Sequence, residues 1–315
     1  MFSIYRKELA DHFSSTRFLI LFCLITMVAL VTTYMVGASL KTQLEGVAKP
    51  KYVFLMLFTT SGQFFSLAQF IAFFGPLIGL VMGFDAINRE RNAGTLSKLI
   101  SQPIFRDAVI NGKFLAGVTT ITVMLVSLIL LISGLGLLTV GVVPGAEEVG
   151  RLFIYLIVSI AYVAFWLGLS ILFSIFFRSI ATSALAAVAL WIFFSFFIAF
   201  AANLLANTAA PVDNERNMEQ VMANNKVARG ASLVSPVVLY SQATSTILDP
   251  FRKTTKDLVM MGQMEKISMS RFQNPLPLDQ SILVVVPYIT SLLALTMLCF
   301  GVSYLAFMRQ EIRSA

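Results

Sequence analysis

Charged side chains are scarce in this sequence. Asp, Glu, Lys and Arg make up 12% of its 315 residues, whereas 57% of the residues are hydrophobic. A soluble domain carries about 25% charged residues, and so apolar a chain could not cover its core with a polar, water-facing surface. Lipid must therefore solvate most of its exterior, which predicts an integral membrane protein.

Residues for metal binding and nucleophilic catalysis are also few. His12 is the single histidine, and the two cysteines, Cys23 and Cys299, lie inside apolar runs. A metal shell or a catalytic triad needs several such groups together. We therefore expect no catalytic residues and no metal site, and we expect His12 to be a surface residue. The sequence does not predict an enzyme.

A phosphate-binding loop of the form Gly-x-x-x-x-Gly-Lys-Ser/Thr is absent from the sequence. Gly112 and Lys113 are followed by Phe114, which has no hydroxyl group for magnesium. We therefore expect no cofactor in this chain. The net charge of +7 forms no basic stripe with interleaved aromatic residues, which argues against nucleic acid as a partner.

Six apolar segments approach the roughly 20 residues that a spanning helix needs. The predicted fold is therefore an all-α polytopic membrane protein with six transmembrane helices. The third segment could break near Gly134, Gly136 and Gly141. None of the six contains a charged residue, which argues against a proton-coupled carrier. The segments are Phe18–Gly37, Phe64–Phe84, Phe114–Val143, Leu152–Phe177, Ile180–Ala202 and Ser281–Met308.

The distribution of Lys and Arg in the short loops predicts the orientation. One side of the predicted bundle has many more of them than the other, and the basic side faces the cytoplasm. An even number of spans then places both termini in the cytoplasm. The basic side holds Arg6, Lys7, Arg17, Arg89, Arg91, Lys98, Arg106, Lys113, Arg178, Arg309 and Arg313; the other holds Lys41, Lys49, Lys51 and Arg151.

The polar parts divide the chain further. Residues 1–17 are predicted to form a cytoplasmic interfacial helix, with Phe2, Tyr5, Leu9 and Phe13 on its apolar face and Glu8 among its charged residues. Residues 18–202 contain the first five spans, and 203–280 an extracytoplasmic helical domain. The last span, 281–308, precedes a cytoplasmic tail, 309–315.

Gly75, Gly79 and Gly83 recur every fourth residue on one face of the second span. This spacing permits close helix packing. Two interpretations remain open from the sequence. The stripe could be a moving interface near a translocation path or a dimer axis, or it could be static packing within one subunit.

The loop at 85–113 carries the clearest functional pattern. Asp85–Asn92 reads as a charged helical extension, and Gly94 permits a turn. Thr95–Ile100 reads as a short amphipathic helix that Pro103 ends. Such a helix at a membrane surface can dock into a groove on a partner.

The pattern Glu90-x-x-x-Gly94-Thr95-Leu96, followed by Ser101-x-Pro103-x-x-Arg106 and Lys113, resembles the cytoplasmic loop of ABC-2 type permeases. The six spans and the interfacial helix agree with that family in layout. Ser235–Tyr240 and Leu248–Pro250 also resemble the subgroup named for multicopper-enzyme maturation, which includes the nitrous-oxide-reductase maturation permease.

The resemblance implies the permease subunit of an ATP-binding-cassette exporter in a prokaryotic plasma (inner) membrane. The loop would be its coupling helix, docked on a separate ATPase subunit that binds ATP and Mg. Glu90 and Arg106 would pair or contact the ATPase, Gly94 would form the turn, and Leu96 would be the apolar anchor. The implied ATPase-coupling residues are Asp85, Glu90, Gly94, Thr95, Leu96, Pro103, Arg106 and Lys113.

Other implied partners are a second permease copy or a homologous permease, membrane lipid, and an extracytoplasmic accessory protein. Two alternatives to the exporter remain open: an ATP-independent carrier or channel, and a membrane scaffold that acts through 203–280. The Met260–Met269 cluster could bind copper, because thioethers are soft ligands, but methionine also fills apolar helix faces. The sequence does not indicate the transported substrate.

Overall fold

A computed structural model describes residues 2–45, 51–59, 66–95, 105–212, 218–252 and 275–309. Within these ranges the regular elements are helices, and no strand occurs. The described helices are α1 (Phe2–Ser14), α2 (Thr16–Leu44), α3 (Val53–Thr59), α4 (Leu67–Gly83), α5 (Asn88–Asn92), α7 (Arg106–Val140), α8 (Ala146–Phe176), α9 (Ile180–Ile192), η1 (Phe193–Phe197), α10 (Ile198–Ala209), α11 (Met218–Ser232), α12 (Pro236–Leu248) and α14 (Leu278–Arg309).

Among the described residues, six helices are long and apolar enough to span a membrane, which confirms the predicted number of spans. They are longer than the apolar segments alone suggest; the third runs from Arg106 to Val140 without a break at Gly134 or Gly136. The helix ends at Gly141, whose left-handed backbone (φ 66°, ψ 33°) caps it. The predicted break is therefore wrong at Gly134 and Gly136, where the helical hydrogen bonds continue through glycine, and is confirmed at Gly141, where the helix ends.

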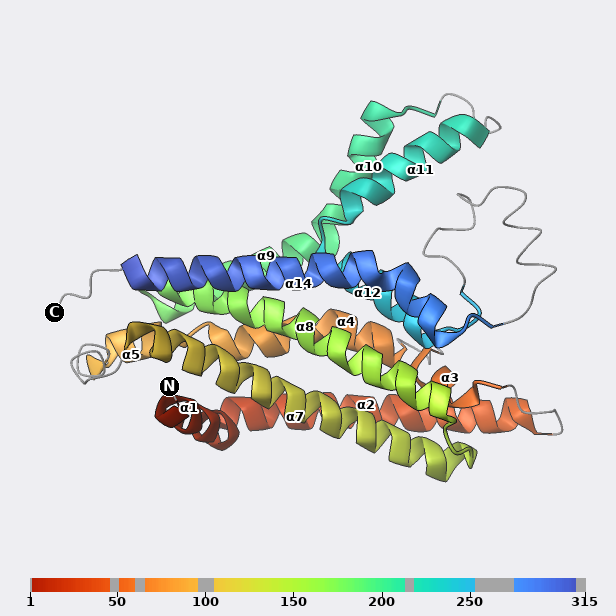
Figure 1. The fold of residues 1–315 in the computed structure, drawn as a ribbon, viewed down its shortest axis with the longest axis horizontal. Coiled ribbons are helices and arrows are strands. Elements are labelled where there is room, and N and C mark those ends of the chain that lie inside the picture. The colour runs from red at the N-terminus through yellow and green to blue at the C-terminus, as the bar shows by residue number, and fades with distance from the viewer. Residues whose placement is uncertain are drawn as a thin grey trace.

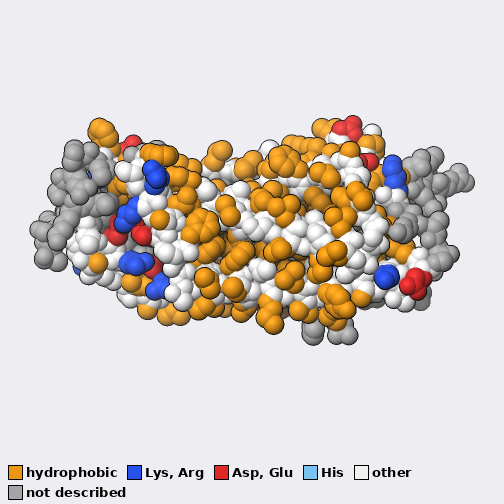
Figure 2. All heavy atoms as spheres, turned by 90° about the horizontal axis from the view of Figure 1, so that it is seen from below, with side chains coloured by type: hydrophobic (Ala, Val, Ile, Leu, Met, Phe, Trp, Pro, Cys, Tyr) orange, Lys and Arg blue, Asp and Glu red, His pale blue; other side chains and the backbone are white. Residues whose placement is uncertain are grey.

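The long helices run side by side in one bundle (Figure 1). Helix α1, α5 and the last residue of α14 lie at one end, here called the terminal end; α3 and the start of α14 lie at the opposite end, here called the far end. Figure 2 shows apolar side chains across the middle of one face, with charged side chains gathered toward both ends. This distribution matches a lipid-exposed surface between two polar interfaces.

The glycine stripe lies where α4 crosses α8. A Cβ added to Gly79 would stand 2.7 Å from the carbonyl oxygen of Val163 and 2.8 Å from the amide nitrogen of Leu167. At Gly83 it would stand 2.9 Å from the Leu167 carbonyl oxygen. Ser170 Oγ also donates to the Leu80 carbonyl at 2.8 Å. The stripe therefore brings two backbones of the same chain into direct contact.

Helix α12 packs within the bundle, against α8 and α14. Tyr240 is fully buried, its ring stacks on Tyr162 with 4.2 Å between centroids, and its hydroxyl lies 2.8 Å from Ser159 Oγ. By contrast, the hairpin of α10 and α11 projects from the bundle (Figure 1). Over its described residues, segment 203–280 thus contains a helix docked in the bundle and most of a hairpin that stands off it. Its extracytoplasmic location stays a prediction.

A π-helical turn precedes the projecting hairpin. In η1 the backbone widens over Phe193–Phe197, and the Phe194 carbonyl accepts a hydrogen bond from Ser235 Oγ at 2.9 Å. Ser235 is the residue before α12. This bond joins the start of α12 to the place where the fifth span changes its hydrogen-bond pattern.

Arg151, in the first turns of α8, is fully buried at the far end. Its Nη1 donates to the Ile247 carbonyl at 2.8 Å and to Ser281 Oγ at 3.2 Å. Its Nη2 donates to the Leu276 carbonyl and pairs with Glu147 Oε1 at 3.1 Å. One guanidinium thus joins α8, the end of α12 and the start of α14, a task for which its planar fork of donors is suited.

Replacing Arg151 with lysine should lower the free energy of unfolding by about 2 kcal/mol. The single ammonium of lysine keeps the charge but cannot reach all of the carbonyl and carboxylate oxygens that the guanidinium serves. Thermal unfolding of the purified protein in detergent measures the effect. The matched control is Lys41→Arg on the exposed part of α2 at the same end, which should change stability by less than about 0.5 kcal/mol; equal effects would contradict the role of Arg151.

Candidate functional site

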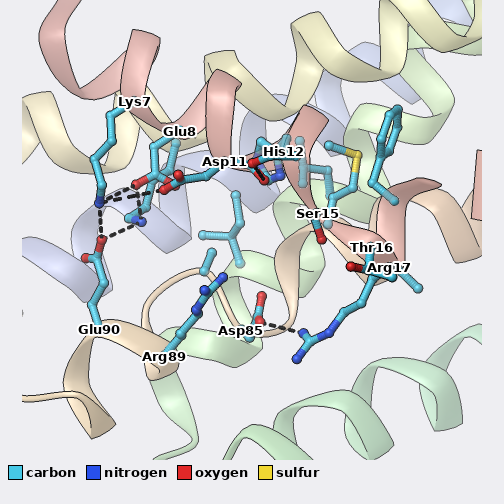
Figure 3. A pocket seen from close by; sticks show the side chains of 18 of the residues that line it. Lys7, Glu8, Asp11, His12, Ser15, Thr16, Arg17, Asp85, Arg89 and Glu90 are labelled. Carbon is cyan, nitrogen blue, oxygen red and sulfur yellow. Dashed lines mark hydrogen bonds and ion pairs between the residues drawn. The ribbon is translucent and has the colours of Figure 1, made fainter. Parts of the chain in front are cut away.

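A buried ion cluster joins α1, α5 and α7 at the terminal end. The Lys113 side chain of α7 is only 5% exposed. Its Nζ lies 2.9 Å from Glu8 Oε1 of α1 and 3.0 Å from Glu90 Oε1 of α5. Lys7 Nζ, in contrast, is largely exposed and lies 3.6 Å from the same Glu90 oxygen (Figure 3). We call Glu8, Glu90 and Lys113 the three-helix cluster.

Helix α1 contributes Glu8 because it packs on α7 with a face that the sequence analysis did not predict. Ile4 and Glu8 are buried, and the Ile4 side chain lies against Gly112. Phe2, assigned to the apolar face, is 70% exposed. The prediction that Glu8 lies on the charged face is therefore wrong, because a buried cation on α7 compensates the desolvation of its carboxylate.

Helix α5 is held in place by the terminal end of α8. Ser174 Oγ accepts hydrogen bonds from the backbone amides of Ile87, at 2.9 Å, and Asn88, at 3.1 Å. The Asn88 side chain is itself fully buried, and its Nδ2 donates to the Ser179 carbonyl at 3.4 Å. A helix of five residues cannot hold itself in place, so these contacts fix the position of Glu90.

Asp85 makes a separate ion pair at the start of the same loop. Its Oδ2 lies 2.7 Å from Arg17 Nη1, and the Arg17 guanidinium also lies over the Phe84 ring, 5.5 Å from its centroid. This pair joins the beginning of α2 to the turn between α4 and α5. The Arg17 side chain is 60% exposed, so the pair contributes little stability of its own.

A cavity of about 600 Å³ separates the three-helix cluster from the Arg17–Asp85 pair. It lies between α1, the start of α2 and the loop that follows α4, and side chains of both charge signs line it (Figure 3). His12 lines it and is half-buried, so the prediction that His12 is simply a surface residue is wrong. The same helix turn that buries Glu8 directs this imidazole toward the cavity wall.

The electrostatics of α1 follow from this burial. Burial by itself acts to raise the pKa of Glu8, but the charges of Lys113 and Lys7 outweigh it and hold that pKa below its usual value. Burial lowers the pKa of His12 by more than the nearby Glu8 charge raises it, and the Lys113 charge lowers it further. At neutral pH the Glu8 carboxylate is therefore ionised, and the His12 imidazole near it is uncharged.

The three-helix cluster is suited to transmit displacement rather than to perform chemistry. One ammonium holds two carboxylates from different elements, so a shift of α5 must move α1 and α7 or break a buried ion pair. Glu90 Oε2 is buried and meets no hydrogen-bond partner among the described residues. Over the same part of the chain, no group of three metal-ligand side chains occurs.

The structure brings some of the predicted coupling residues together. Glu90 and Lys113 are in direct contact, and Asp85 lies on the same cavity. Gly94 has a left-handed φ of 65°, and Thr95 is exposed, its Oγ1 donating to the Glu90 carbonyl at 3.2 Å.

The remaining predictions are less fully described. Arg106 is half-buried at the first position of α7, and the ion pairs of Glu90 are with Lys113 and Lys7 instead. Leu96 and Pro103 lie outside the described residues, as does the Met260–Met269 cluster.

Sequence reasoning missed Glu8, Asn88 and Ser174 as parts of this site. Glu8 had a usable signal, because Ile4, Glu8 and His12 are spaced by four and share one face of α1. Asn88 and Ser174 had none, since their hydrogen bonds connect positions 86 residues apart.

Comparison with known proteins agrees with the resemblance of the loop. A family model described as ABC-2 family transporter protein matches residues 2–312. A curated relative from Stutzerimonas stutzeri, "Probable ABC transporter permease protein NosY", is 29% identical over 153 residues, or 49% of this chain and 50% of the relative. The match thus spans about half the length of this relative. The similarity itself supports the predicted subgroup. With six apolar helices and a family match over nearly its whole length, the chain belongs to the ABC-2 transporter family as a membrane permease.

Proposed function

We propose that this chain is the permease subunit of an exporter whose ATPase is a separate polypeptide, docked on the loop at 85–113. The observation that carries the proposal is the buried contact of Lys113 with Glu8 and Glu90. It gives that loop a mechanical connection to a spanning helix, which a loop that only orients the spans would not need. The partner would bind ATP and Mg.

Force applied at the loop has two routes into the bundle. Through Glu90 and Lys113 it reaches α7 and α1. Through Asn88 and Ser174 it reaches α8, the helix that contacts α4 along the glycine stripe. Closure of two ATPase subunits beneath a permease dimer would thus move most of the bundle.

The proposed location is a prokaryotic inner membrane with both termini in the cytoplasm. Helix α1, helix α5 and the end of α14 at Arg309 lie at the same end of the bundle (Figure 1). The many Lys and Arg residues at that end support the cytoplasmic assignment. An ATPase that uses cytoplasmic ATP would then meet the loop on the required side.

Two variants of the co-purified permease and ATPase test the proposal. In Glu90→Gln, the ATPase should still bind, but its stimulation by the permease should fall about tenfold, because the loop loses its ion pair with Lys113. In Leu96→Asp, co-purification itself should fail, because a charge replaces the apolar anchor. The control is Glu45→Gln, an exposed residue at the far end.

Unchanged ATPase binding and turnover in both variants would contradict the proposal. Cargo movement by the permease without any ATPase would contradict it too, and would favour a carrier or channel.

A further inference from the structure

A second cavity, of about 370 Å³, lies at the far end between the start of α4 and the side of α12. Hydroxyl and carboxamide side chains dominate its described lining. Charge is present only as Asp249 and Arg252 among these residues. The hydrogen-bonding lining residues are Thr59, Ser66, Gln69, Ser241, Gln242, Thr244 and Ser245. We call this cavity the amide cleft.

Helix α12 presents two different faces at the amide cleft. Tyr240, Ala243 and Ile247 are buried in the bundle. The opposite side of the helix carries Ser241, Gln242 and Ser245. These residues are partly or fully exposed and line the cleft. Packing of α12 into the bundle therefore leaves a polar face of this helix toward the cleft.

One atom in the amide cleft lacks the partner that its burial requires. Gln242 Oε1 is buried and meets no hydrogen-bond donor among the described residues. A buried acceptor without a donor is unfavourable, so an external donor is expected there. Across the cleft, Gln69 uses its Oε1 to accept from the Ser66 amide at 3.0 Å, which completes the cap of α4 and leaves its NH₂ group as a donor.

The depth of the amide cleft places it beyond the lipid core. About 20 helical residues cross a 30 Å hydrocarbon layer. Counted back along α14 from Arg309, this length ends close to Tyr288. At this depth the Tyr288 hydroxyl accepts from Arg229 at 2.9 Å, as suits an interface. The cleft lies between the start of α4 and the second half of α12. Both segments lie toward the far end of the bundle (Figure 1), so water can enter the cleft.

We propose that the amide cleft is an outer binding site for an uncharged, peptide-like segment of the cargo. A carboxamide offers one acceptor and two donors, which match the N–H and C=O of a peptide group in a pair of hydrogen bonds. Gln242 supplies such a group on one wall, and Gln69 adds the donors of its NH₂ group on the other. Ala68, Ala72 and Leu248 leave room for small apolar side chains. The identity of the ligand as cargo rests on the proposed exporter function.

Cysteine labelling of the permease–ATPase complex in sealed vesicles tests this proposal. Ser245→Cys is made after replacing the native Cys23 and Cys299, and an anionic, membrane-impermeant thiosulfonate is added from either side. Reaction is expected only from the side of the far end. The control, Leu298→Cys, which is 65% exposed on the lipid-facing surface of α14, should not react.

Protection by a probe then tests the ligand class. N-acetyl-trialanine amide should slow the labelling of Ser245→Cys, and the added change Gln242→Leu should weaken this protection about tenfold. Labelling equal to that of Leu298→Cys, no slowing by the peptide, or protection by maltotriose in its place would each overturn the proposal. These measurements need no ATP. If the peptide protects Ser245→Cys as expected while ATP and vanadate leave the labelling rate unchanged, the binding role of the amide cleft is supported and the proposed exporter function is contradicted.

Discussion

Replacing Lys113 with methionine should destabilise the protein by about 3–5 kcal/mol, because it removes the buried cation between Glu8 and Glu90. The remaining cation, Lys7, is largely exposed and lies 3.6 Å from each carboxylate, so it compensates only in part. Both carboxylate side chains are 12% exposed, so water can solvate them only in part. The change should also separate α1 and α5 from α7. Thermal unfolding in detergent measures the stability, and permease-stimulated ATP hydrolysis measures the loss of coupling.

A triple variant, Glu8→Gln, Glu90→Gln and Lys113→Met, separates charge imbalance from loss of shape. It removes the cation and both anions together, and so should recover most of the stability lost in the single variant. Coupling should stay low, because no ion pair then joins the helices. A single variant as stable as the unmodified protein, or a triple variant less stable than the single one, would contradict the cluster's role.

Replacing Gly79 with leucine should cost about 3 kcal/mol or more and prevent α4 from docking on α8. The obstacle is backbone: the Val163 carbonyl and the Leu167 amide lie 2.7 and 2.8 Å from the new Cβ. A flexible side chain could rotate away, whereas a helix backbone cannot move without separating the two spans.

Gly134→Leu in α7 is the matched control, since no atom lies within 4 Å of its Cβ. Leucine there should change stability by no more than about 1 kcal/mol, because it enters lipid and is a good helix former. Yield of monodisperse protein and the thermal midpoint measure both variants. Equal behaviour of the two would show that the α4–α8 contact does not depend on glycine.

Several properties could be predicted from the sequence because they depend on local composition. Six apolar runs predict six spans, since a run of that length has few stable alternatives to a spanning helix in lipid. Gly75, Gly79 and Gly83 predict a close helix contact, because their spacing puts them on one face. The loop from Glu90 to Arg106 indicates the family by its residue pattern. The α4–α8 partnership itself, and so the meaning of the glycine stripe, could not be predicted.

Tertiary structure decided which residues act together. Lys113 is paired with Glu8, 105 residues away, and only the docking of α1 on α7 makes this carboxylate buried rather than solvated. Tertiary packing also placed α12 inside the bundle and exposed its polar side at the amide cleft. The physical reason is the same in each case. Periodicity reports which residues share a face of a helix, but the partner of that face is set by contacts between distant segments, whose desolvation and ion-pair energies depend on the assembled bundle.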